Sequence, residues 1–165
     1  MKKMFLLSAL ATIAVLSAAD GFAIDSTATG NAKVIIVDPV TVTHSGDALD
    51  FGEATASESH VITIEETDGS VSSTVSGQLI TSPNDGRDEF VVTGPQGVGV
   101  NVSLPDGLAI NDKLNITSFR ADCGNSFTMP DAGSKTVKVG GTLAVTAGAT
   151  SGTYDENSYT LTVSY

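Results

Sequence analysis

The sequence predicts an all-β protein built as an antiparallel sandwich of about eight or nine strands. Short apolar runs alternate with polar residues, and the last run places Tyr159, Leu161 and Val163 on one face. Turn residues such as Gly, Pro, Asn and Asp recur about every 8–12 residues. After residue 23, the apolar residues show no sustained helical period. Together these observations favour strands along the whole chain after its leader.

Residues 1–23 have the pattern of a secretory signal peptide. Lys2 and Lys3 precede an apolar run over residues 5–16, and small residues then lead to a cleavage site after Ala23. The apolar run is about a dozen residues long, too short for a membrane span of ~20 residues. We therefore expect the leader to be cleaved and the protein to be exported.

The mature chain is expected to begin with a flexible leader over residues 24–31, which are small and polar. Residues 32–165 are then predicted to form one sandwich domain. Its first strand covers residues 33–43 and contains Pro39, which cannot donate to a central ladder. The proline therefore predicts a bend or a change of sheet within this strand.

Two hairpins are expected further along the chain. One joins residues 89–93 to residues 98–104 around a Gly/Pro turn, and the other joins the run at Leu143 and Val145 to the terminal strand. Only 5% of the residues are aromatic and there is no tryptophan, so Val, Ile and Leu must form most of the core. Three bulky residues outside the clearest strands are expected to complete it: Phe51, Phe127 and Met129.

Charge and cysteine content limit the partners that this chain can have. The formal net charge is −11, and such a surface repels nucleic acid and anionic lipid. Cys123 is the only cysteine, so no disulfide can form within the chain. It is either a buried small hydrophobe or a partner in an intermolecular bond, and we favour the first.

The sequence contains no convincing catalytic or cofactor motif, so we expect no enzyme, no cofactor and no metal site. His44 and His60 lack a partner at metal-binding spacing and are interpreted as surface histidines. Residues 84–89 gather oxygen ligands in a loop, but Arg87 offsets their charge and the spacing fails the EF-hand pattern. The glycine-rich residues 94–99 lack a following helix and are interpreted as a turn.

Six short segments spread over most of the mature chain form a recognisable set. They are Leu-Asp-Phe-Gly at 49–52, Val-Thr-Gly at 92–94, Val-Ser-Leu-Pro at 102–105, Val-Gly-Gly-Thr-Leu-Ala-Val at 139–145, Gly-Thr-Tyr at 152–154 and the terminal run at 159–165. Together these segments resemble the bacterial secreted family known as domain of unknown function 4402. This resemblance implies an immunoglobulin-like β-sandwich exported by Gram-negative bacteria, and it implies no enzymatic activity.

The C-terminal end is also similar, more distantly, to that of chaperone–usher pilins, since Gly152 is fourteenth from the end. Tyr165 is the last residue rather than the penultimate one, and the pilin disulfide is missing. Residues 32–42 could be donated to a neighbouring subunit, or they could equally be the domain's own first strand. The terminal strand correspondingly packs either against that strand or against a strand from another chain.

Two functions are compatible with these features. The first is an exported, non-enzymatic structural or surface protein, such as a pilin-like, adhesion or matrix subunit. Its partners would be other copies of itself or surface and fimbrial components joined by strand addition. The second is a monomeric periplasmic or secreted module whose ligand binds to loops such as residues 82–88 or 122–133. In both cases the protein is expected in the periplasm, on the cell surface or outside the cell.

Overall fold

The computed structural model describes residues 26–165, and the predicted signal peptide, residues 1–23, lies outside this part. The chain divides into two compact units, Met1–Ile35 and Ile36–Tyr165. Within the first unit, residues 26–35 form no regular secondary structure and are exposed. The second unit contains all the strands and is described below.

The second unit is built from antiparallel strands, and residues 26–165 contain no helix. Seven strands form the larger sheet: β1 (Thr41–His44), β3 (His60–Ile64), β4 (Val71–Ser73), β6 (Asp88–Thr93), β8 (Leu108–Asn111), β9 (Leu114–Ala121) and β11 (Ser134–Val145). A second sheet has the order β10-β7-β12, formed by β10 (Ser126–Thr128), β7 (Gly99–Ser103) and β12 (Thr162–Ser164). A small ribbon pairs β2 (Glu53–Ala54) with β5 (Leu79–Thr81).

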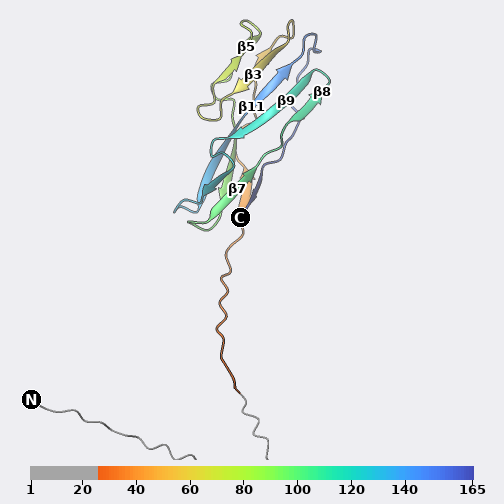
Figure 1. Cartoon of the computed structure of the whole chain (residues 1–165). Helices are drawn as coiled ribbons and strands as arrows, with labels where there is room; N and C mark the ends of the chain where they lie inside the picture. Colours follow the sequence, from red (N-terminus) through yellow and green to blue (C-terminus); the bar gives the residue numbers. More distant parts are fainter. Residues whose placement is uncertain (1–25) are drawn as a thin grey trace, which may run out of the picture. The chain divides into compact units, whose positions relative to one another are not determined.

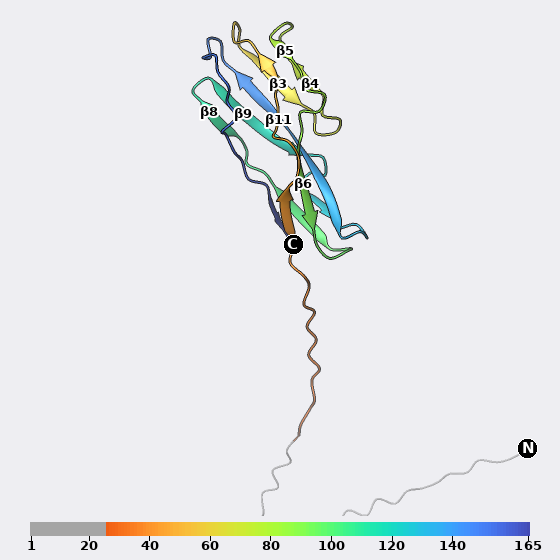
Figure 2. The same cartoon turned by 180° about the vertical axis from the view of Figure 1, so that it is seen from behind.

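Strand β11 organises the larger sheet, because it pairs with three other strands along its 12 residues. Its first half pairs with β6, and its second half lies between β3 and β9 (Figures 1 and 2). The change of partner takes place at Gly140 and Gly141. A Cβ at Gly140 would lie 2.4 Å from the Ile64 carbonyl oxygen and 2.8 Å from the Glu66 nitrogen, so only glycine fits there.

The two larger sheets share one hydrophobic core, which makes the unit a sandwich. Side chains alternate between core and solvent along β7, as the period of a half-buried strand requires. Along β9 the alternation changes phase between Ile116 and Phe119, where the pairing with β11 shifts its register. The most deeply buried members of the core, each at most 1% exposed, are Ile62, Val92, Val100, Met129, Val137 and Val139. Phe51 and Phe127 pack against this cluster as partly buried residues.

The predicted all-β antiparallel sandwich is therefore confirmed, as is the role of Met129 in the core. The structure has more strands than the eight or nine expected. The additional ones include β2, β5 and β10, each of two or three residues. Such ladders are too short for a period of two to show in the sequence.

Both predicted hairpins are wrong. Strand β6 belongs to the larger sheet and β7 to the second sheet, so the turn at residues 94–98 carries the chain between layers. Strand β11 and the terminal strand are separated in the same way, because β12 pairs with β7. Alternation of apolar and polar residues predicts that a strand has one buried face, but it does not predict which sheet the strand joins.

The first strand is shorter than expected and begins at Thr41, after Pro39. It pairs with β6 in its own chain and also contacts β12, although no ladder joins those two strands. The Tyr165 hydroxyl donates to the carbonyl of Asp38. The terminal strand thus lies beside the chain's own first strand, one of the two alternatives that the sequence left open.

Replacing Gly140 with Ala should destabilise the fold by about 1–3 kcal/mol, because the new methyl group would press on backbone atoms of β3 and the residues after it. Urea unfolding measures this loss. Gly99→Ala is the matched control, since no atom lies within 4 Å of its added Cβ, and it should change stability by less than about 0.5 kcal/mol. Equal losses in the two variants would contradict the role assigned to Gly140.

Candidate functional site

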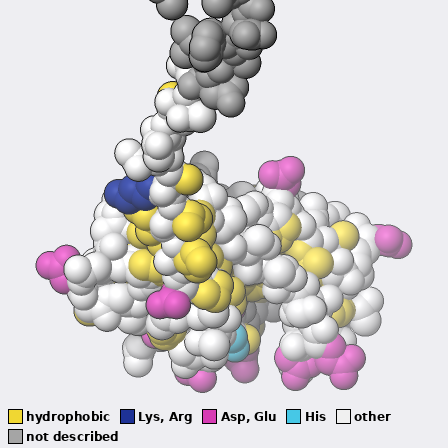
Figure 3. Space-filling model, turned by 90° about the horizontal axis from the view of Figure 1, so that it is seen from below, with side chains coloured by type: hydrophobic (Ala, Val, Ile, Leu, Met, Phe, Trp, Pro, Cys, Tyr) yellow, Lys and Arg dark blue, Asp and Glu magenta, His cyan; other side chains and the backbone are white. Residues whose placement is uncertain are grey.

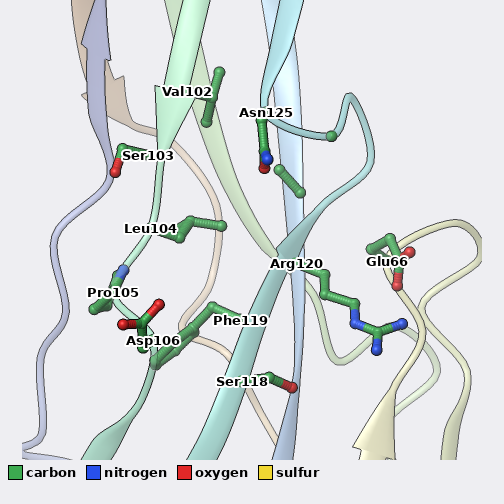
Figure 4. Close-up of a pocket in the computed structure, with 12 residues that line it drawn as sticks. Glu66, Val102, Ser103, Leu104, Pro105, Asp106, Ser118, Phe119, Arg120 and Asn125 are labelled. Carbon is green, nitrogen blue, oxygen red and sulfur yellow. The ribbon is translucent and has the colours of Figure 1, made fainter.

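A groove of about 560 Å³ opens between the two larger sheets. One wall is the chain at the end of β7 and just after it, and the other is the C-terminal half of β9. Leu104 and Phe119 point into the space between these segments from opposite sides (Figure 4). Val102 and Ala121 add buried apolar surface to the lining. The groove therefore reaches the hydrophobic core from the side of the sandwich.

The wall formed by β9 is a strand edge. Strand β8 pairs with β9 only as far as Leu108, which lies opposite Ile116. From Ser118 to Ala121, one edge of β9 pairs with β11. Along the opposite edge, where β8 pairs with the earlier residues of β9, no strand of the described residues pairs with this stretch. We call residues 117–121 the β9 edge. Such an edge presents backbone N–H and C=O groups that can pair with another extended chain.

Charged side chains of both signs border the groove. Asp106 lies on the β7 side, Arg120 projects from β9, and Glu66 lies beyond Arg120 (Figure 4). None of these three takes part in an ion pair among the described residues. On the face seen in Figure 3, acidic side chains lie mainly around the rim, and several are gathered at its lower right edge. The groove thus combines an apolar floor with charges that are available to a partner.

A second feature is an exposed apolar segment ahead of β1. Val34, Ile35 and Ile36 are 82%, 71% and 90% exposed, and Val37 is about half exposed. All four are β-branched and therefore suited to a strand, yet residues 33–38 belong to none of the sheets. We call residues 33–38 the arm. Large apolar side chains exposed side by side are typical of surfaces that bind a partner.

The sequence did not predict the polar cluster formed by His44, Asp88 and Tyr159. Asp88 is 4% exposed; its two oxygens lie 2.6 Å from His44 Nε2 and 2.8 Å from the Tyr159 hydroxyl, which donates to it. Phe119 stacks on the Tyr159 ring. Burial, followed by the bond to Asp88, raises the pKa of Tyr159 above its ordinary value. The cluster joins β1, β6 and the segment before β12, which indicates a structural role.

In the loop at residues 84–89, carboxylates pair with Arg87 of the loop itself and with Lys138 of β11. Arg87 Nη2 lies 2.6 Å from Asp85, and Arg87 Nη1 donates to the carbonyls of Glu66 and Thr67. Lys138 lies 2.7 Å from Glu89. The hydrogen bond from Arg87 holds the pKa of Asp85 at about 2, below its ordinary 3.8. The Asp85 and Glu89 carboxylates are therefore paired with basic side chains of the same domain. Separately, no cluster of metal-binding side chains is found among residues 26–165.

The two histidines differ from each other in location. His44 is exposed as predicted, whereas the expectation of a surface position is wrong for His60, which is 4% exposed at the start of β3. Its Nδ1 bonds to the Glu58 carbonyl, and its Nε2 has no partner within the described residues. Burial follows from the inward phase that His60 shares with Ile62. Cys123 is a free, partly buried residue against the core, and burial raises the pKa of its thiol.

The family model described as a domain of unknown function (DUF4402) matches residues 40–165. The chain belongs to this family. The match begins just before β1 and extends to the last residue, so it covers every strand and leaves out the arm. Comparisons with curated proteins and with solved structures gave no match. Within the described residues of this DUF4402 protein, no helix is long and apolar enough to cross a membrane.

Tyr159→Phe should destabilise the domain by about 1–3 kcal/mol, because it removes a donor from a buried carboxylate. Denaturant unfolding provides the measurement. The control is Tyr154→Phe, whose hydroxyl bonds only to the nearby Thr150 carbonyl in an exposed segment. The control should stay within about 0.5 kcal/mol of the wild type. A loss that is no larger for Tyr159→Phe than for the control would contradict the structural role of the cluster.

Asp85→Asn should lower stability at pH 7 by at most about 1 kcal/mol, because this carboxylate is 42% exposed and partly screened by solvent. The folded-state pKa is depressed, so the ion pair stabilises the fold above about pH 4. This contribution is lost as the pH falls towards 2. Unfolding free energies of the two proteins between pH 7 and pH 2 should therefore converge at the acid end. A constant difference over that range would contradict the assignment.

Proposed function

We propose that this protein is an exported, non-enzymatic structural subunit that assembles with other copies of itself by strand addition. The observation that carries the proposal is the arm. Its four consecutive β-branched residues are exposed to water. Burying their apolar side chains in a sheet would be favourable, because it removes apolar surface from water. In strand addition, backbone hydrogen bonds supply affinity and alternate side chains enter pockets of the acceptor. Residues 34–37 have the composition that this mode of binding requires.

Export and location rest on the leader sequence. The basic residues, the apolar run and the small residues before Ala23 are typical of a secretory signal peptide. A net charge of −11 and a chain with a single cysteine suit a surface protein that is held together by packing. The proposed location is the periplasm, the cell surface or the exterior of the cell, where the protein would be a pilin-like, adhesion or matrix subunit.

The polar groups inside the domain support a structural role. The buried carboxylate of Asp88 is occupied by His44 and Tyr159, and the loop carboxylate of Asp85 is occupied by Arg87. These groups connect strands and loops to one another. Each is therefore explained by the stability of the sandwich, whereas the exposed apolar side chains of the arm contribute nothing to that stability.

The proposal is tested with the mature protein by light scattering, electrophoresis and negative-stain microscopy. We expect concentration-dependent multimers or filaments, and Ile35→Asp should abolish them by placing a charge in the arm. The matched control is Ile80→Asp on β5, where the isoleucine is 64% exposed, and this variant should still assemble. A wild-type protein that stays monomeric at every concentration would contradict the proposal and favour the monomeric ligand-binding module. Equal effects of the two variants would indicate unspecific adhesion.

A further inference from the structure

We propose that the β9 edge of one copy accepts the arm of a second copy as an added strand, whose inward side chains fill the groove. This inference rests on the proposed function, since it names the acceptor for the same assembly. The occupant is residues 33–38 of another identical chain. The arm would take the empty place beside β9 that begins beyond the pair of Leu108 and Ile116.

The backbone of the β9 edge is oriented to receive a strand. The Asp122 N–H donates to the Lys138 carbonyl on β11 over 2.9 Å. In an antiparallel ladder, successive residues point their N–H and C=O groups to opposite sides. The groups of Ser118 and Arg120 therefore face β11, and those of Phe119 and Ala121 face outward. The Ala121 carbonyl accepts from Gly124, which leaves both groups of Phe119 and the N–H of Ala121 for an incoming chain.

The chain geometry explains why β8 does not fill this place itself. Gly107 lies so close to β9 that a Cβ on it would be 2.6 Å from the Ile116 carbonyl oxygen. Residues before Gly107 turn away towards β7 and the second sheet. The hairpin of β8 and β9 consequently has strands of four and eight residues. Because the two strands differ in length, half of β9 is exposed together with the groove beneath it.

The arm fits this acceptor in length and in side-chain chemistry. Six residues of strand extend over about 20 Å, and the five residues of the β9 edge extend over about 17 Å. Two alternate apolar side chains of the arm would enter the groove between Leu104 and Phe119, where they cover the exposed side of the core. This burial would remove apolar surface of both copies from water.

Charges at the two ends of the arm complement those of the groove. Lys33 begins the arm and Asp38 ends it, whereas the groove carries Glu66, Asp106 and Arg120. A lysine would be attracted by the two carboxylates, and an aspartate by the arginine. The base of the arm is held in its own copy, because the Asp38 carbonyl accepts from the Tyr165 hydroxyl. Residues 33–37 precede this attachment, which uses only the backbone of Asp38, so these residues and the Asp38 carboxylate are available to a neighbour.

Cysteine cross-linking between two full-length variants tests the contact directly. Both variants carry Cys123→Ser; the donor also carries Ile36→Cys and the acceptor Ser118→Cys, and they are mixed under mild oxidation. We expect a disulfide-linked dimer of donor and acceptor. Ser72→Cys on the edge of β4 replaces the acceptor in the matched control and should give at least tenfold less cross-linked dimer.

The outcomes separate this inference from the proposed function. Multimers of the wild type without cross-linking at Ser118, or with equal cross-linking at Ser72, would overturn the β9 edge as acceptor while the proposed function stands. A wild type without any multimers would overturn both. Cross-linking within one chain of an Ile36→Cys and Ser118→Cys double variant, with no dimer from the mixture, would show that the arm folds back onto its own copy.

A charge exchange provides an independent check. Arg120→Glu should weaken assembly about tenfold at low salt, because it turns an attraction to Asp38 into a repulsion. Adding Asp38→Lys to the same chain should restore most of that loss. Light scattering over a range of protein concentrations measures both effects. Loss of assembly in Arg120→Glu without rescue, in a variant whose unfolding midpoint is unchanged, would contradict the pairing of these two residues.

Discussion

The fold depends on strand β11, which forms hydrogen-bonded ladders with different strands along its two halves. Strand β11 pairs first with β6 and then with β3, while β9 pairs along its other side. The change of partner brings the backbone of β3 against Gly140 so closely that no side chain fits. Because β11 also supplies Val137, Val139, Leu143 and Val145 to the core, a distortion at this point would affect both the ladder and the packing.

Polar contacts hold the end of the chain where no ladder does. Between Val145 and Thr162 the chain forms no strand, and residues 150–158 are exposed. Tyr159 then bonds to Asp88, and Tyr165 bonds to the carbonyl of Asp38. These two tyrosines fix the last segment against β6 and the residues before β1. The same contacts determine where the arm leaves the domain, and thus connect the stability of the sandwich to its proposed assembly.

Much of the fold could be predicted from residue patterns. Strands β3, β7 and β9 follow from alternation, and burial of Ile62, Val100 and Ile116 follows from the same phase. The groove could not be predicted, because it depends on where β8 leaves β9 and on which layer receives β7. The unequal lengths of the runs at Leu108–Asn111 and Leu114–Ala121 were the only local signal. Likewise, Asp88 and Tyr159 are 71 residues apart, and nothing local pairs them.

The sequence by itself determined the class of the protein, since periodicity, turn residues and composition are local properties that act within a few residues. It also determined the apolar character of residues 34–37, which does not depend on any fold. Only the tertiary structure decided how strands are distributed between sheets, because an alternating strand can pair with any suitable edge. The same choice of partners left half of β9 without a neighbour and placed Leu104 opposite Phe119.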